Sequence, residues 1–279
     1  MQIIDGKAVA QKVKEKLQQE LKHLPPQTLG IISLGNNPAS QRYIQRKIAA
    51  AESLGIAVKH FSLPRQTTET ELIKLIKKCN VNPLMTGFIV QLPLPFSPEK
   101  IFLEINPDKD LDGVHPFNIG KLSTAQPILI PATAAGIMRL LEEYDIQLAG
   151  SHAVIIGRSN IVGKPTATLL LQQNATVTIT HSHTKDLDHY TKQANILIVA
   201  AGKPKFITAD MIKPGAVVID VGTTVIDGKL IGDVDFEGVK QKASFISPVP
   251  GGVGPMTVAM LLHNLVVVAK RSIKDKKGL

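Results

Sequence analysis

The stretch AVIIGRSNIVGKPTATLL, Ala153 to Leu170, decides the fold of this 279-residue chain. In it, a short apolar run breaks into a turn marked by glycines and then restarts as a helix. Gly157 and Gly163 permit a tight turn and a close backbone approach, while the free N–H groups and positive dipole of the following helix favour a phosphate. The pattern predicts a dinucleotide-binding turn at the start of a Rossmann-type domain.

The spacing of this turn differs from two familiar phosphate-binding motifs. Gly157, Ser159 and Gly163 do not match G-x-G-x-x-G, and a P-loop would need glycines five apart followed by Lys-Ser or Lys-Thr. Here Lys164 precedes Pro165. An ordinary strand-to-helix turn is the alternative interpretation.

The segment after the predicted strand 175–180 indicates which dinucleotide binds. An NAD site favours an acidic residue there, whereas this chain has HSHT at 181–184. Ser182, with Arg158 of the first turn, would accommodate a 2′-phosphate, so the sequence predicts NADP. The alternatives are a plain polar loop, or a metal site built from these histidines and His189. Because no cysteine or carboxylate completes a zinc-like pattern, we expect no metal.

Composition limits the class of protein. With 44% hydrophobic residues, the chain can build two modest α/β domains, each with its own core. The single Cys79 excludes an intramolecular disulfide, and the segment MQIIDGKAVAQKVKEKL lacks an apolar signal-peptide core, so we expect a cytoplasmic protein. No apolar run is expected to approach the length of a membrane span.

The net charge of +9 raises the question of nucleic acid binding. The chain has three tyrosines, no tryptophan and no basic recognition motif, so we expect no nucleic acid partner. A basic balance also suits polyanionic small molecules such as NADP or a polycarboxylate substrate.

Strand-like and helix-like runs alternate along the chain and predict parallel sheets. The irregular stretch 111–131 marks the expected domain boundary, and a helix at about 133–144 would cross between the domains. We predict a first domain at 1–130, with a C-terminal helix (257–279) packing back on it, and a Rossmann domain at 131–256. The predicted strands are 28–34, 56–63, 87–92, 153–156, 175–180, 196–200 and 216–221; the predicted helices include 7–24, 38–54 and 68–78.

Two polar residues of the first domain are candidates for chemistry. Tyr43 and Lys47 lie four apart on one helical face, and Lys47 sits at the edge of the buried stripe, where a partly desolvated stem equips it for proton transfer. Gln91 ends an apolar strand, and the helix that carries Lys47 also follows a strand, so the two side chains can converge on one cleft. The alternative is a surface lysine whose stem covers apolar neighbours.

Two further loops carry candidate residues. PDKDLDGVHP begins like a calcium loop, but its twelfth position is Ile119, which cannot supply a carboxylate, so calcium is not expected. Asp112 can accept N–H groups of a substrate, or be a simple turn aspartate. SPVPGGVGPMT, at 247–257, fixes a specific path and lets backbone approach a flat ligand.

Five motifs, in order along nearly the whole chain, resemble the methylenetetrahydrofolate dehydrogenase/cyclohydrolase family: NPASQRYIQRK, VQLPLP, PDKDLDGVHP, GRSNIVGKP and SPVPGGVGPMTVAMLL. The resemblance implies NADP-dependent oxidation of 5,10-methylenetetrahydrofolate to the methenyl form, and its hydrolysis to 10-formyltetrahydrofolate in one-carbon metabolism. It also implies a homodimer and tetrahydrofolate derivatives as ligands.

The resemblance also implies roles for individual residues. Lys47 becomes the catalytic lysine, Tyr43 lines the pterin site, Gln91 positions the lysine, and Asp112 binds the pterin ring. The implied coenzyme contacts are Gly157, Arg158, Ser159, Ile161, Gly163, Ser182 and Thr223, and the implied further substrate contacts are Leu92, Pro250, Gly251 and Gly252.

The chain departs from the family pattern at two places. It has Pro-Ala-Thr-Ala at 131–134 where the family usually has Pro-Cys-Thr-Pro, and Thr223-Thr224 where the family usually has Ile-Asn. Neither change removes a proposed proton-transfer group. They leave open a catalytically silent NADP-binding protein, or an NADP dehydrogenase of another small polar substrate in which Lys47 binds a carboxylate.

Overall fold

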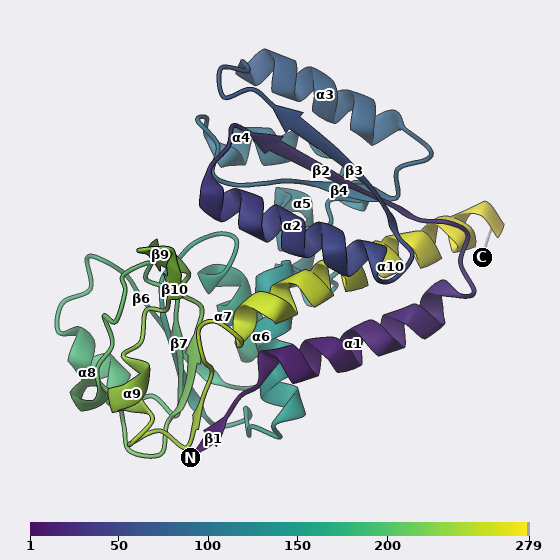
Figure 1. Ribbon diagram of the computed structural model, residues 1–279. Helices are drawn as coiled ribbons and strands as arrows, with labels where there is room; N and C mark the ends of the chain where they lie inside the picture. Colours follow the sequence, from purple (N-terminus) through teal and green to yellow (C-terminus); the bar gives the residue numbers. More distant parts are fainter. Residues whose placement is uncertain (278–279) are drawn as a thin grey trace. The chain divides into compact units, whose positions relative to one another are not determined.

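The computed structural model describes residues 1–277, and the chain divides into two compact units. We name each unit after its main sheet (Figure 1). The six-stranded unit consists of Met1–Gln11 and Thr133–Thr257, and the three-stranded unit consists of Lys12–Ala132 and the chain from Val258 onward. Two units of mixed helix and strand confirm the predicted α/β class.

The sheet of the three-stranded unit is parallel throughout, with the strand order β3-β2-β4. Its strands are β2 (Thr28–Leu34), β3 (Ala57–Leu63) and β4 (Gly87–Val90), its connecting helices are α2 (Pro38–Glu52) and α3 (Glu69–Val81), and the shorter α4 (Pro98–Leu103), η1 (Pro107–Lys109) and α5 (Pro116–Ser123) follow. A capping box of Thr68 and Glu71 starts α3, and the hydrogen bonds from Thr68 lower the pKa of the Glu71 carboxyl. The observed alternation of strands and helices confirms the predicted parallel arrangement.

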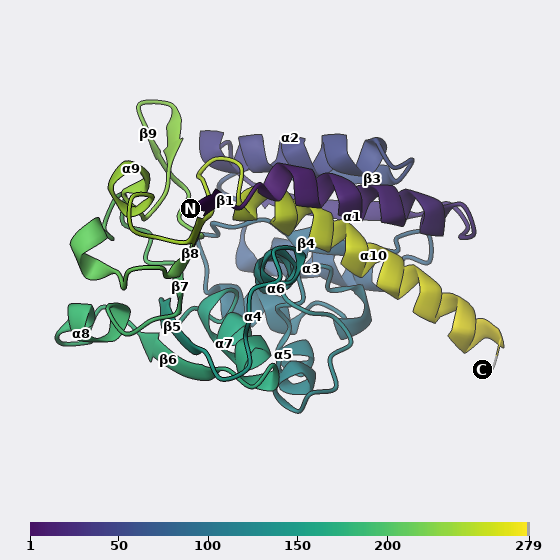
Figure 2. The ribbon, with the colours of Figure 1, turned by 90° about the horizontal axis from the view of Figure 1, so that it is seen from below.

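Helices α1 (Gly6–Leu21), α2 and α10 (Val253–Lys277) cover one face of this sheet (Figures 1 and 2). Leu29 and Ile31 of β2 point into the same core, because alternate residues of a strand share a face. Figure 1 shows α3 on the opposite face. The buried side chains that α10 contributes are Leu261, Leu262, Leu265, Val266 and Val268, which confirms that the C-terminal helix packs back on the first domain.

The six-stranded sheet is also parallel, with the order β1-β11-β8-β7-β5-β6. Because β6 and β7 flank β5 on opposite sides, the winding of the chain reverses between β5 and β7, and ligands of open α/β sheets bind at such a point, outside the carboxyl ends of the strands. The strands are β1 (Gln2–Ile3), β5 (His152–Ile156), β6 (Thr176–Thr180), β7 (Ile196–Val199), β8 (Val217–Asp220) and β11 (Phe245–Ile246). The remaining elements are α6 (Ala132–Glu143), α7 (Gly163–Gln172), α8 (Leu187–Thr191), η2 (Ala209–Met211), α9 (Phe236–Val239) and an antiparallel hairpin of β9 (Thr224–Ile226) and β10 (Lys229–Ile231).

Helix α10 corrects one expectation from the sequence. By length and composition, its segment Val253–Lys274 could cross a membrane, with a mean hydropathy of 1.5, so the expectation that no apolar run approaches that length is wrong. The helix is apolar because it is a core element: 61% of that window is buried inside the protein. The buried Asn264 supports this, since its Nδ2 donates to the carbonyl oxygens of Leu111 and Ile130 at 2.9 Å each.

Several elements were not predicted. The stretch expected to be irregular, 111–131, contains α5, which starts at Pro116 after the His115 ring accepts the N–H of Phe117 at 3.0 Å. The β9–β10 hairpin and the two-residue strands β1 and β11 are too short to show a periodic pattern. Pairing of β1 with β11 places the start of the chain in the six-stranded sheet.

Candidate functional site

Lys47 of the three-stranded unit is buried, at 6% exposed. Its Nζ donates to Oε1 of Gln91 at 3.0 Å. Lys47 lies on α2, and because helical side chains lean toward the amino end of their helix, it extends toward the carboxyl edge of the sheet. The structure therefore joins two of the residues predicted to converge.

Gln91 is fixed on both its backbone and its side chain. Its N–H donates to Ile32 at 2.8 Å, and its Nε2 donates to the carbonyl of Leu92 at 2.9 Å. The same carbonyl accepts the hydroxyl of Ser40, in the first turn of α2, at 3.1 Å. These bonds leave Oε1 of Gln91 aimed at the lysine.

The chemistry of this pair follows from its charge. An ammonium taken out of water is stabilised by a hydrogen-bond partner, and here that partner is a neutral amide instead of a carboxylate. A lysine placed in this way can exchange a proton with a bound molecule without first breaking an ion pair. The arrangement suits general acid–base chemistry.

Tyr43 lies one helical turn before Lys47 on α2. Its hydroxyl is buried and has no hydrogen-bond partner among the residues that the structure describes. Buried hydroxyls are nearly always satisfied, so this one indicates a place for a polar group of a ligand.

Asp112 lies at the same end of β4 as Gln91. A parallel bridge pairs Phe88 with Asp110, and the N–H of Leu111 donates to Phe88 at 3.3 Å, so this segment runs alongside β4 in the same direction. Gly113 then makes a turn with φ +69°, in which an added Cβ would lie 2.6 Å from the carbonyl carbon of Ile130. This turn holds the partly exposed Asp112 at the strand end.

The neighbouring Asp110, which the sequence analysis missed, is the buried member of this acidic segment at 1% exposure. Its Oδ2 accepts the N–H of His115 at 2.7 Å and Nδ2 of Asn118 at 3.0 Å. Burial raises the pKa of this carboxyl to about 6, against those hydrogen bonds. Asp110 therefore organises the turn, and only its burial, which no motif reveals, distinguishes it from Asp112.

Asp110 predicts a pH dependence of stability. A carboxyl whose pKa is higher in the folded than in the unfolded chain binds more protons when folded, so its contribution to stability is complete below pH 3.8 and is lost as the pH rises to about 6. Asp110→Asn keeps an oxygen acceptor for both donors. In the wild type, Asp110 should make the free energy of unfolding fall by up to about 1.4 kcal/mol per pH unit between pH 4 and 6. We expect Asp110→Asn to lack this contribution, as measured by denaturant unfolding at each pH.

The matched control is Asp108→Asn, because Asp108 is an exposed carboxylate two residues away. This variant should keep the slope. An unchanged slope in Asp110→Asn would show that Asp110 does not titrate in this range.

The six-stranded unit holds the predicted nucleotide turn at the carboxyl end of β5. Gly157 has φ +121°, and a Cβ there would lie 2.3 Å from the carbonyl oxygen of Ala200. A Cβ on Gly163, the first residue of α7, would lie 2.0 Å from the carbonyl oxygen of Gly157. Both positions exclude any side chain, as a turn that brings backbone close to a phosphate requires.

The first turn of α7 is capped from within the loop. The Ser159 hydroxyl accepts the N–H groups of Val162 and Gly163 at 3.1 and 3.4 Å. After β6, the chain forms a compact turn in which His181 and Thr184 exchange two hydrogen bonds of 2.9 Å, leaving Ser182 exposed. The structure brings to one edge of this sheet, at the ends of β5, β6 and β8, all the predicted coenzyme residues: Gly157, Arg158, Ser159, Ile161, Gly163, Ser182 and Thr223.

The loop with Pro250, Gly251 and Gly252 belongs to the same unit. Gly251 accepts the N–H of Lys7 at 3.1 Å, and a Cβ on Gly6 would lie 1.8 Å from the carbonyl oxygen of Gly252. The loop therefore packs on the start of α1. The predicted substrate residues thus divide between the units, with Tyr43, Gln91, Leu92 and Asp112 in the three-stranded one.

Within residues 1–277, no three His, Cys, Asp or Glu side chains form a cluster that could hold a metal ion. The residues present instead suit a dinucleotide, since two glycines leave no room for a Cβ and no carboxylate occupies 181–184.

Comparison with known proteins assigns a family to both parts of the chain. Residues 4–112 match the catalytic domain, and residues 131–273 the NAD(P)-binding domain, of the tetrahydrofolate dehydrogenase/cyclohydrolase family. The chain is 50% identical over 274 residues to the bifunctional protein FolD of Exiguobacterium sibiricum, covering 96% of this chain and 99% of that protein. It is 49% identical over 278 residues to the protein of the same name in Bacillus subtilis, covering 97% and 98%.

Solved structures give the same result. The bifunctional FolD methylenetetrahydrofolate dehydrogenase/cyclohydrolase of Campylobacter jejuni matches with a TM-score of 0.94 at 46% identity, covering 98% of this chain and 99% of that one. The Trypanosoma brucei enzyme, complexed with NADP and an inhibitor, matches at 0.93 and 37% identity, covering 98% of both chains. These matches confirm the resemblance found in the five motifs: the chain belongs to the tetrahydrofolate dehydrogenase/cyclohydrolase family.

Proposed function

We propose that this chain oxidises 5,10-methylenetetrahydrofolate with NADP and hydrolyses the methenyl product to 10-formyltetrahydrofolate, with Lys47 as the group that moves protons. The dehydrogenase and cyclohydrolase activities are those of its family in one-carbon metabolism. The observation that supports the role of Lys47 is the contact between its buried Nζ and Oε1 of Gln91.

The hydrolytic step defines what the lysine must do. Water adds to the carbon of the methenyl cation and loses a proton, and the ring then opens when the bond from this carbon to one nitrogen breaks and that nitrogen is protonated. Lys47 accepts the first proton and returns it to the nitrogen, while Gln91 holds its Nζ in place. Tyr43 and Asp112 then hold the pterin ring, through the unpartnered hydroxyl and the carboxylate.

The coenzyme side uses the six-stranded unit. NADP, when bound, accepts the hydride. Gly157, Gly163 and the amino end of α7 would hold its diphosphate, and Arg158 and Ser182 would receive the 2′-phosphate. Ser159, Ile161 and Thr223 are assigned to the same ligand, and the loop 250–252 to the flat part of the substrate.

Ser182 provides a test of the phosphate assignment. Ser182→Asp places a carboxylate where the 2′-phosphate should lie, so we expect NADP affinity to fall by at least about tenfold while NAD affinity is unchanged or improved. Calorimetric titration with each coenzyme measures this, and Ser182→Asn is the uncharged control. Equal loss of both coenzymes, or no loss of NADP, would mean that the phosphate binds elsewhere.

The two departures from the family pattern lie in packing positions or at the surface. Ala132 is buried in the core of the three-stranded unit and Ala134 is fully buried, so the first departure alters packing. Thr223 is exposed after β8. A spectrophotometric assay with methylenetetrahydrofolate, supplying NADP or NAD in parallel, tests the whole proposal. Turnover with NADP supports it. No turnover despite NADP binding favours a dehydrogenase of a different substrate or a silent binding protein.

Three further assignments belong to this proposal. We assign the folate chemistry to residues 1–130 together with 257–279, and coenzyme binding to residues 131–256. Strand β1, at the start of the first range, pairs with β11 in the six-stranded sheet. We also propose a cytoplasmic homodimer, as the family resemblance implies. Light scattering should give a mass of twice 30.1 kDa, and a single-chain mass would refute the dimer.

A further inference from the structure

Two buried aspartates lie near the carboxyl ends of β7 and β8 in the six-stranded sheet, outside every role assigned above. Asp220 ends β8 and is 4% exposed, and Asp233 follows β10 and is fully buried. Oδ2 of Asp233 accepts the N–H groups of both Ala201 and Gly202 at 2.7 Å. One carboxylate oxygen therefore fixes two successive amides of the turn that follows β7.

This turn presses on the nucleotide turn. The N–H of Ala200 donates to Ile156 at 2.8 Å, and the carbonyl oxygen of Ala200 occupies the space that a Cβ of Gly157 would fill, 2.3 Å away. The backbone of Ala200–Gly202 therefore forms the surface against which Gly157 packs. A shift of this backbone segment would also displace Gly157.

Asp220 in turn holds Asp233 and the end of β8. Its Oδ1 accepts the N–H groups of Gly222 and Asp233 at 2.8 and 3.0 Å, and its Oδ2 accepts that of Val234 at 3.0 Å. A Cβ on Gly222 would lie 2.4 Å from the Asp233 carboxyl carbon. The two carboxylates therefore fix the turns after β7 and β8 together.

Burying these two carboxyl groups lowers the stability of the fold. Burial raises the pKa of both carboxyls, that of Asp220 to about 6, and Oδ1 of Asp233 is buried without a partner among the described residues. An unpaired buried acceptor reduces stability, so packing alone does not account for a carboxylate at this place.

We propose that Asp233, held by Asp220, is a positioning residue that fixes the Ala200–Gly202 turn in the shape that the coenzyme site needs before NADP binds. The inference rests on the proposed NADP-dependent function and adds a residue to it. Asp233 touches neither coenzyme nor substrate in this role; it acts through the backbone amides of the turn and through Gly157.

The first test is hydrogen exchange on the wild-type protein without coenzyme. The amides of Ala201 and Gly202 should exchange as slowly as those of β7 and should slow little more when NADP is added. Exchange at the rate of an open loop, with protection only after NADP is added, would overturn the proposal. This measurement needs no variant to fold.

The second test uses substitutions. Asp233→Ala removes the oxygen that accepts the N–H groups of Ala201 and Gly202. It should weaken NADP binding, measured directly by calorimetry, by about tenfold or more, since hydrogen bonds to a charged group are lost. The KM for NADP should rise while the cyclohydrolase rate, measured without coenzyme, stays within twofold of wild type. Asp233→Asn can keep one oxygen for both amides and should restore most of the affinity.

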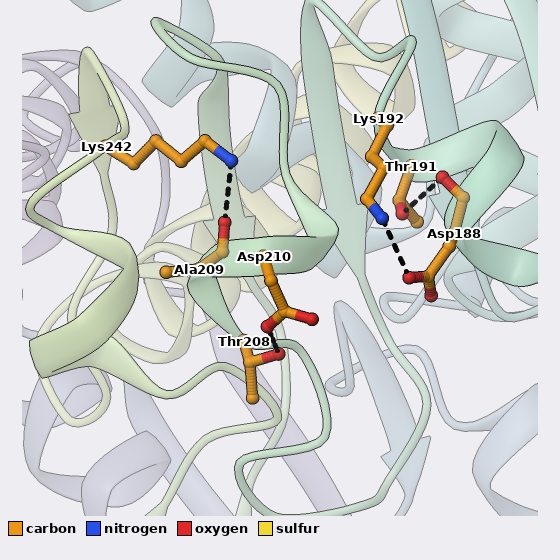
Figure 3. Close-up of polar contacts among 7 residues, drawn as sticks. All are labelled: Asp188, Thr191, Lys192, Thr208, Ala209, Asp210 and Lys242. Carbon is orange, nitrogen blue, oxygen red and sulfur yellow. Dashed lines mark hydrogen bonds and ion pairs between the residues drawn. The ribbon is translucent and has the colours of Figure 1, made fainter.

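The matched control is Asp210→Ala. Asp210 is an exposed carboxylate of the same unit, whose Oδ1 accepts the Thr208 hydroxyl at 2.5 Å (Figure 3). It should bind NADP as wild type does. Asp233→Ala with unchanged NADP affinity, or with cyclohydrolase and coenzyme binding lost in proportion, refutes the positioning role; a wild-type protein that does not bind NADP refutes the proposed function itself.

Discussion

Replacing Lys47 by methionine should lower the cyclohydrolase rate by about a hundredfold or more and leave NADP affinity unchanged. Methionine keeps the length of the aliphatic stem in a site where Lys47 is 6% exposed, but it cannot take or give a proton. A positioned general acid or base typically contributes about 10²- to 10⁴-fold. The effect is measured without coenzyme by monitoring the absorbance of methenyltetrahydrofolate, which falls as the compound is hydrolysed.

Two controls separate chemistry from folding in this experiment. Arg46→Met removes a positive charge from the adjacent, exposed position of α2 and should leave both activities near wild type. Urea unfolding should show Lys47→Met to be at least as stable as the wild type, since a buried charge is removed. Cyclohydrolase activity at the wild-type level in Lys47→Met would remove this lysine from the mechanism.

Gly163→Ala should weaken NADP binding by about tenfold or more, although it adds a single methyl group. The added Cβ would lie 2.0 Å from the carbonyl oxygen of Gly157, so either α7 or the nucleotide turn must shift. The atoms that the Cβ would meet belong to the backbone of Gly157 and Arg158, which cannot move aside as a side chain can. Overpacking of this kind typically costs about 1–3 kcal/mol. Calorimetric titration and urea unfolding of the same protein measure the two effects.

Gly120→Ala is the matched control for this prediction. Gly120 lies inside α5, and a Cβ there meets nothing within 4 Å. Alanine favours a helix over glycine, so this variant should be slightly more stable and should bind NADP normally. If Gly163→Ala also binds NADP like the wild type, the close approach to Gly157 is not required by the coenzyme.

Much of the architecture could be predicted because long elements carry strong patterns. The buried strands of both sheets are runs of β-branched and apolar residues, and the predicted limits 28–34 coincide with β2. Short elements could not be predicted, because β1 and β11 have two residues each and depend on pairing with each other. The apolar length of α10 was underestimated because its polar residues, His263 and Asn264, interrupt the run only locally.

The site could be predicted in part for the same reason. Lys47 and Gln91 are tied to elements with clear patterns, so their approach followed from a helix position and a strand end. Asp233 could not be found in this way, since the β9–β10 hairpin must first return the chain to the turn after β7. A single sequence does not reveal such a contact between residues 31 or 32 positions apart.

Helix α10 has a consequence for the order of events during synthesis. Its side chains Leu261, Leu262 and Leu265 complete the core that also contains Leu29 and Ile31, yet they leave the ribosome more than two hundred residues later. Until α10 has been made, the nascent chain exposes one apolar face of β2 and α2, and chaperones act on surfaces of this kind. The three-stranded unit is therefore completed only after the whole six-stranded sheet has been made, and loss of α10 would expose the core of strands made more than two hundred residues earlier.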